Sequence, residues 1–230
     1  MRKNELACDN IYHIYNRGVE KRLLFLNNND YSRFIQGLVI FNDIKPALNF
    51  KYKIDKIENS AKKKKPLVNI LAFCLMPNHF HLLLQPREDN GITKFMRKLC
   101  VGYANYFNLK YQRVGSLFQG KFKSVLIDDE SQFTYIPYYV HLNPLDLIYS
   151  DWRNKGINEP KKALDFLGSY KWSSYRDYIG KRNFPFVIHK DLLNEFFGGE
   201  VGHKRAFHSF IKDSNFFEFF DNSTIDFGNQ

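Results

Sequence analysis

The stretch LVNILAFCLMPNHFHLLLQP, residues 67–86, holds two apolar runs separated by the tripeptide MPN. Proline and asparagine form turns, so the stretch predicts a β-hairpin or a close pair of strands. The second run begins with His79 and His81. Side chains at positions i and i+2 of a strand point to the same face of a sheet. We therefore expect the two imidazoles to project together, with Phe80 directed toward the core.

The segments on both sides of this pair alternate between strand and helix patterns. Residues 10–18 (NIYHIYNRG) and 121–127 (KFKSVLI) are typical of strands. Helical spacing of apolar residues, or Asn and acidic caps, predicts helices over 27–43, 91–111 and 128–144. The order strand, helix, strand, strand, helix, strand, helix predicts an α+β fold. It is a ferredoxin-like βαββαβ antiparallel sheet with helices on one face, which leaves the other face available for a site.

The chain is expected to divide near residue 150. Residues 1–149 form the βαββαβ domain, with an insertion at about 44–66 whose lysine run, 62–65, is read as a solvated loop. Residues 150–230 form a C-terminal helical extension, with helices around 190–197 and 200–212. This extension is expected to act as an added DNA-contacting or lid segment.

Composition narrows the class of partner and the compartment. The 230 residues include 34 Lys and Arg against 24 Asp and Glu, and the net charge of +10 favours a polyanionic partner. Cys8, Cys74 and Cys100 are widely spaced without a CxxC motif, which is typical of reduced thiols. No run approaches the roughly 18 apolar residues of a membrane span. We expect a cytoplasmic protein with no membrane partner.

The two histidines suit a metal site only if other groups converge on them. A pair of imidazoles in an HxH pattern is a weak signal by itself, and two half-exposed histidines on a sheet surface are the better explanation unless other groups converge. Tyr139 and Asn143 lie four residues apart and share a helix face. A carboxamide oxygen can complete a site with two imidazoles, and this mixed set suits Mg²⁺ or Mn²⁺ better than a closed zinc site. Spacing alone does not select Tyr139 among 14 tyrosines.

Several motifs resemble those of a known family. MPNHFHLLLQP, GSLFQGKFKS, YYVHLNPL and WSSY, in this order, resemble the single-tyrosine HUH transposases of insertion sequences, and within them the REP-associated tyrosine transposases. YHIYNRG and RLLFLNNNDYSRFI fit the same pattern. The resemblance implies that His79, His81 and Asn143 hold a divalent metal, Mg²⁺ or Mn²⁺, and that Tyr139 is the nucleophile. It also implies cleavage and strand transfer of single-stranded DNA at hairpin-flanked sites through a 5′-phosphotyrosine.

Some residues depart from this pattern or compete with the assignment. Pro137 lies two residues before Tyr139, so the helix that carries the nucleophile either begins near there or is kinked. Tyr135 and Tyr138 are close enough to Tyr139 to be alternative nucleophiles. His141 is expected to point elsewhere on the helix, at the surface.

Basic side chains are the expected DNA contacts, because phosphate neutralisation dominates nucleic-acid affinity. Lys94, Arg97 and Lys98 form a stripe on one predicted helix, and Lys121 and Lys123 alternate on one strand face. Arg17 and Arg113 are further candidates. The rings of Phe118 and Trp172 could stack on bases, but we expect both in the core.

Other functions remain open at this point. A βαββαβ sheet can also serve as a nucleic-acid platform, so a non-catalytic hairpin-binding protein is the main alternative. A metal-dependent phosphodiesterase that uses water as the nucleophile is a second, and a decayed transposase retained for binding is a third. The chain is expected to act as a monomer or a homodimer.

Overall fold

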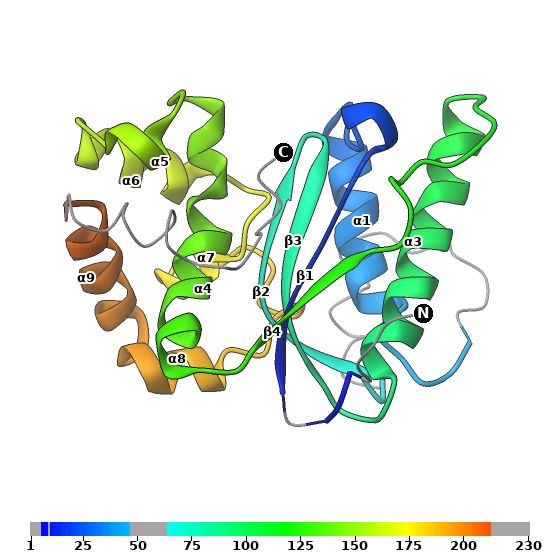
Figure 1. Ribbon diagram of the computed structural model, residues 1–230, viewed down its shortest axis with the longest axis horizontal. Helices are drawn as coiled ribbons and strands as arrows, with labels where there is room; N and C mark the ends of the chain where they lie inside the picture. The colour runs from blue at the N-terminus through cyan, green and yellow to red at the C-terminus, as the bar shows by residue number, and fades with distance from the viewer. Residues whose placement is uncertain (1–5, 9, 47–63, 213–230) are drawn as a thin grey trace.

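The computed structural model describes residues 6–8, 10–46 and 64–212, and its centre is one four-stranded sheet (Figure 1). The strands are β1 (Ile11–Arg17), β2 (Val68–Met76), β3 (His79–Pro86) and β4 (Lys123–Ile127), in the spatial order β2-β3-β1-β4. All neighbouring strands are antiparallel. The predicted α+β, ferredoxin-like βαββαβ arrangement is confirmed.

Two crossover helices cover one face of this sheet. Helix α1 (Asn28–Ile40) begins at a capping box, in which the Asn27 side chain accepts from the Asp30 backbone N–H and Asp30 accepts from that of Asn27. Helix α3 (Gly91–Lys110) lies beside it (Figure 1). Their apolar sides meet Phe80 and its neighbours in a fully buried core. Phe80 therefore points away from the two histidines, as expected.

The opposite face is covered by a second layer of helices rather than left open. It begins with α4 (Glu130–Leu142), and the layer continues through the C-terminal extension (Figure 1). The further elements are η2 (Asn143–Leu147), α5 (Trp152–Lys155), α6 (Pro160–Ser169), α7 (Tyr175–Tyr178), α8 (Asp191–Phe197) and α9 (Gly199–Lys212); a short η1 (Val19–Lys21) follows β1. The physical reason is that Leu71, Cys74 and Leu83 point to this face and need an apolar cover. The two last helices match the predicted ones.

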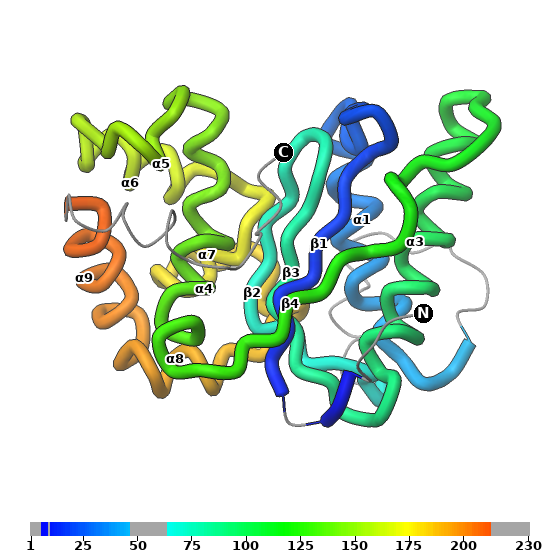
Figure 2. Tube along the Cα trace, viewed as in Figure 1, coloured from blue at the N-terminus to red at the C-terminus, as the bar shows by residue number. Residues whose placement is uncertain are grey.

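The extension also covers the edge of β2. The backbone N–H of Leu75 donates to Trp172 O at 2.9 Å, and the N–H of Ser174 donates to Phe73 O at 3.0 Å. The N–H of His189 donates to Ile70 O at 2.8 Å. The path of these segments along β2 can be followed in Figure 2. An edge strand whose polar groups are satisfied in this way is protected from pairing with other chains.

The aromatic rings of the WSSY and GSLFQ motifs are in the core, as predicted. The Trp172 ring stacks on Tyr31 with 4.6 Å between centroids, and Phe118 packs beside Phe80. Neither ring is therefore available to stack on unpaired bases without a rearrangement of the core.

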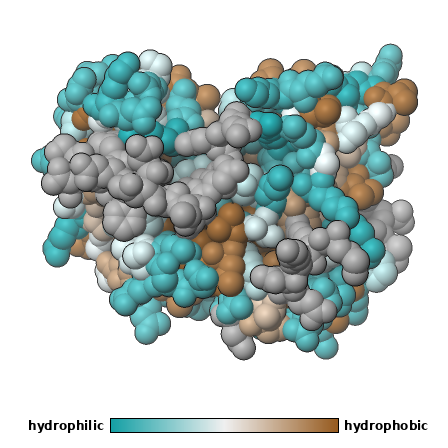
Figure 3. All heavy atoms as spheres, viewed as in Figure 1, coloured by the Kyte–Doolittle hydropathy of each residue, from teal (hydrophilic) through white to brown (hydrophobic). Residues whose placement is uncertain are grey.

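On the visible face in Figure 3, hydrophilic side chains dominate and apolar ones gather near the middle, where β4 lies.

The predicted insertion at about 44–66 lies mostly outside the described residues. At its described margins, Lys64 pairs with Asp43 at 3.3 Å, and the N–H of Ile44 donates to Lys65 O. Of the helices in the described ranges, none is both long enough and apolar enough to span a bilayer.

Candidate active site

Three histidines lie together on the face of the sheet that α4 covers. His79 and His81 come from β3, and their ring centroids are 5.0 Å apart at nearly a right angle. His13 comes from the adjacent strand β1, and its Nε2 is 2.9 Å from Nδ1 of His81. His13 and His81 are buried and His79 is half-buried. The expectation of a shared face for His79 and His81 is therefore met, with a third imidazole beside them.

Helix α4 brings Tyr139 to these histidines. The Tyr139 ring lies edge-on to His81 with 5.4 Å between centroids, and edge-on to His13 at 5.5 Å. Its side chain is 1% exposed. The helix runs through Pro137, so it does not begin there.

Asn143 follows one turn later and faces the same site. Its Nδ2 donates to the backbone oxygen of Tyr139 at 2.6 Å. This bond directs the other atom of the carboxamide, Oδ1, away from the helix backbone, and Oδ1 lies 3.5 Å from the Arg153 guanidinium. The Asn143 side chain lies close enough to His79 to oppose the fall in the pKa of His79. All four residues singled out in the sequence thus come together.

The two other tyrosines of α4 point into the C-terminal extension. Tyr138 stacks on Phe210 with 3.8 Å between ring centroids, and Tyr135 lies 5.7 Å from the same ring. Burial raises the pKa of Tyr138 to about 12 and also raises that of Tyr135. Of the three candidate nucleophiles, Tyr139 is the one that meets the histidines.

Burial keeps the imidazoles neutral. Desolvation lowers the pKa of His79 to about 4, against the opposing effects of Asp146 and Asn143. It lowers the pKa of His81 well below its usual value and that of His13 to about 3. Neutral imidazole is the form that binds metals, because each ring then keeps one nitrogen lone pair.

The candidate donors are two imidazoles and one carboxamide, and they fit a divalent ion that binds both nitrogen and oxygen ligands. Among the described residues, no three His, Cys, Asp or Glu side chains lie close enough together to hold an ion. The carboxamide of Asn143, which lies near His79, is a candidate third ligand of another kind. Two imidazoles and one neutral oxygen suit Mg²⁺ or Mn²⁺ with open positions for substrate and water.

Comparison with known proteins finds a similar family and a similar fold. The family model described as "Transposase IS200 like" matches residues 48–143, which include all four residues. The match covers less than half of the chain, so it shows a likeness to the IS200-like transposases. A solved structure of a REP-associated tyrosine transposase bound to a REP hairpin has a TM-score of 0.52 and 11% identity; the match covers 84% of this chain and 92% of that one. No curated protein matches the sequence. The predicted resemblance is confirmed.

One histidine near the site, His141, differs from its prediction. His141 is fully buried rather than at the surface, and its Nε2 is 2.8 Å from the Ser174 hydroxyl oxygen. Burial lowers its pKa to about 3. The prediction was wrong because α4 is packed between the sheet and the extension, so no side of its C-terminal half meets solvent.

Two residues beside the candidate site were missed by the sequence analysis. His13 alternates with Tyr15 and Arg17 along β1, a pattern that could have placed it on the site face. The Arg153 guanidinium lies 5.9 Å from the Tyr139 ring centroid and is paired with Asp146. Arg153 belongs to a short helix without a periodic pattern, so the sequence offers no signal for it.

The predicted basic contacts fall into two groups. Arg17 and Lys123 lie on the site face, since β1 and β4 place them opposite His79 and Tyr15 respectively. Arg17 also donates to the Gln119 carboxamide oxygen. Lys121 precedes β4, which begins at Lys123, so the predicted alternation of these two lysines along one strand is wrong.

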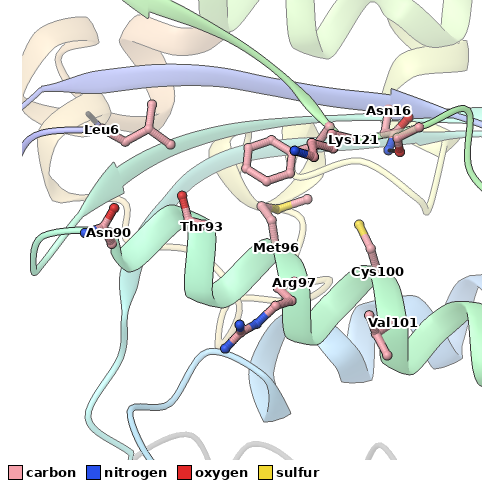
Figure 4. Close-up of a pocket in the computed structure, with 11 residues that line it drawn as sticks. Leu6, Asn16, Asn90, Thr93, Met96, Arg97, Cys100, Val101 and Lys121 are labelled. Atoms are coloured by element: carbon pink, nitrogen blue, oxygen red, sulfur yellow. Dashed lines mark hydrogen bonds between the residues drawn. The ribbon is translucent and has the colours of Figure 1, made fainter. Parts of the chain in front are cut away.

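The second group lies near α3, on the other side of the sheet. Figure 4 shows Thr93, Met96 and Cys100 pointing from α3 into a cavity of about 470 Å³ that Lys121 also lines. Four basic side chains belong here: Lys94 pairs with Glu88 at 2.7 Å, Lys98 donates to Asp43 O at 2.6 Å, Arg113 donates to Asn108 Oδ1 at 2.8 Å, and Arg97 lines the cavity. The protein thus carries positive charge on both sides of its sheet.

Proposed function

We propose that this protein cleaves and rejoins single-stranded DNA beside hairpins through a covalent 5′-phosphotyrosine on Tyr139. The observation that carries the proposal is the meeting of α4 with β3, where Tyr139 and Asn143 face His79 and His81. A hairpin substrate is supported by the REP hairpin bound in the similar solved structure. The motif order in the sequence supports the same reaction.

We assign His79, His81 and Asn143 as the ligands of the metal. The first two offer neutral ring nitrogens, and the third offers its carboxamide oxygen. When bound there, Mg²⁺ or Mn²⁺ would supply positive charge that stabilises the scissile phosphate during attack.

In the proposed reaction, the Tyr139 hydroxyl oxygen attacks phosphorus and the bond from phosphorus to the 3′-oxygen breaks. The phenol proton passes to solvent and the departing 3′-oxygen gains one. This leaves a free 3′-hydroxyl and a 5′-phosphate esterified to Tyr139. Attack by the 3′-hydroxyl of another strand end reverses the step, so phosphodiester bonds are exchanged rather than hydrolysed.

Positive charge near the phenol is a chemical requirement of this step, since a phenol has a pKa of about 10 in water. Arg153 is placed to contribute, because its guanidinium lies over the Tyr139 ring. Arg17 and Lys123 can then bind the phosphates that flank the scissile one, and Lys94, Arg97, Lys98, Arg113 and Lys121 more distant ones. The protein would act as a monomer or a homodimer.

The test uses hairpin DNA with single-stranded flanks, labelled on the 3′ flank, incubated with the full chain and Mg²⁺ or Mn²⁺. We expect label on the denatured protein, and its loss on chelation and in Tyr139→Phe. Tyr138→Phe is the matched control, because Tyr138 is adjacent but packs against the extension, and it should retain the adduct. Equal labelling of Tyr139→Phe would refute the nucleophile. Cleavage without adduct would indicate a water-dependent phosphodiesterase, and retention of DNA without cleavage a non-catalytic binder.

A further inference from the structure

His13 is a buried imidazole to which the proposed reaction gives no role. Its ring is stacked on that of His81 with 5.1 Å between centroids and 14° between planes. Its side chain is 0% exposed. The bond between His13 Nε2 and His81 Nδ1 adds a link through two side chains to the backbone pairing of β1 with β3. A buried polar contact of this kind restricts the orientation of both rings.

His79, the other histidine among the proposed ligands, makes a comparable hydrogen bond through its Nδ1. Nδ1 of His79 is 2.7 Å from Oδ1 of Asn78. A carboxamide oxygen only accepts, so the proton of His79 is on Nδ1 and the lone pair is on Nε2. A ligating histidine commonly donates its second ring N–H to an acceptor in this way, which fixes its tautomer and its orientation.

For His81 the partner is another imidazole, so the proton has two possible places. If His13 Nε2 carried it, His81 would hold its own proton on Nε2 and have no lone pair directed away from His13. If His81 Nδ1 carries it, the Nε2 lone pair of His81 faces the site as that of His79 does. Only the second arrangement gives two matched nitrogen ligands.

We propose that His13 is a positioning residue that accepts the Nδ1–H of His81 and so holds Nε2 of His81 ready to bind the metal. This rests on the metal site of the proposed function. His13 itself is not a ligand, because its Nε2 is directed at His81. His13 is the acceptor for His81, as Asn78 is the acceptor for His79.

The first test is the tautomer of His81 in the metal-free full chain, read from ring ¹⁵N NMR with His81→Gln as the assignment control. We expect the proton on Nδ1. A proton on Nε2 would overturn the proposal. This measurement needs no substitution at His13, so it stands even where a variant does not fold.

The second test compares three substitutions at His13 by titration with Mn²⁺ alone, with thermal unfolding as the check of folding. His13→Gln places an acceptor oxygen near the position of Nε2, His13→Asn places one near Nδ1, and His13→Leu has none. We expect Mn²⁺ affinity to fall about 10- to 100-fold in His13→Leu and in His13→Asn. The affinity should be largely kept in His13→Gln. An equal loss of Mn²⁺ affinity in all three variants would show that His13 has no positioning role. Unchanged Mn²⁺ affinity in a folded His13→Leu variant would show the same.

A separate measurement distinguishes this proposal from the proposed function. His79→Ala should lose Mn²⁺ binding whatever His13 does. If the unsubstituted chain does not bind Mn²⁺, or if His79→Ala binds it equally well, the metal site itself is wrong. If His79→Ala loses binding while His13→Leu keeps it, only the role of His13 is wrong.

Discussion

Asn143 donates its side-chain N–H to the backbone oxygen of Tyr139, one helical turn earlier, at 2.6 Å. The proposed metal ligand and the proposed nucleophile are therefore tied to one another at the end of α4. The carbonyl of Tyr139 would otherwise lack this partner near the end of the helix, where intrahelical donors run out. A change at Asn143 should affect both the ligand set and the helix end.

Asn143→Ala should lower Mn²⁺ affinity by about tenfold or more, because it removes both the oxygen ligand and the bond that orients it. Asn143→Asp keeps an oxygen ligand and should retain more affinity than Asn143→Ala, although it no longer donates to Tyr139. Titration with Mn²⁺ measures both. Asn154→Ala, on the exposed side of α5, is the control and should match the unsubstituted chain. Equal affinity in Asn143→Ala would remove Asn143 from the ligand set.

Arg153→Met should slow formation of the Tyr139 adduct by about 100-fold while leaving hairpin affinity nearly unchanged, because one preorganised positive group beside the reacting atoms is lost. Arg153→Lys should recover part of the rate, since it restores charge but not the planar fork. Single-turnover labelling gives the rate. Lys155→Met removes an exposed charge from the same helix and should have little effect. A similar loss in Lys155→Met would mean that general electrostatics, and not position, explains the result.

Acid should destabilise the fold through its buried histidines. Burial lowers the pKa of His141 to about 3 and that of His203 to about 4, while an unfolded histidine titrates near about 6.5. Below about pH 6.5 the unfolded chain therefore binds more protons than the folded one, so the free energy of unfolding is greatest above this pH and falls as the pH is lowered toward the folded values. A single such histidine contributes a loss of about 2 kcal/mol between pH 7.5 and 5.

Chemical denaturation at several pH values measures this loss. His141→Gln should flatten the dependence, whereas His208→Gln, at an exposed position of α9, should leave it unchanged. Equal slopes in the two variants would contradict the assignment of the effect to buried imidazoles.

Ser174→Ala should lower the free energy of unfolding by about 1–3 kcal/mol, since it leaves buried polar groups without their partner. The Ser174 hydroxyl oxygen accepts the N–H of Phe73 at 2.9 Å and is bonded to His141. Ser169→Ala, at the exposed end of α6, is the control and should cost less than about 0.5 kcal/mol. If Ser174→Ala left the free energy of unfolding unchanged, the WSSY segment would be held by its backbone hydrogen bonds and its tryptophan.

The parts of the site that depend on local spacing were readable from the sequence. The alternation of His79 and His81 and the four-residue spacing from Tyr139 to Asn143 follow from strand and helix geometry alone. The bond from His13 to His81 depends on the register of two strands 68 residues apart in the chain, which no local pattern fixes. His141 was misplaced because a helix covered on two sides has no solvent face for the pattern to show.

The covered edge of β2 has a consequence for how copies of this chain can assemble. Residues 172–174 and His189 already occupy backbone groups of that strand. A second molecule cannot continue the sheet at β2 unless residues 172–174 first lose their hydrogen bonds to this strand. Any dimer built by strand addition must therefore form elsewhere on the molecule.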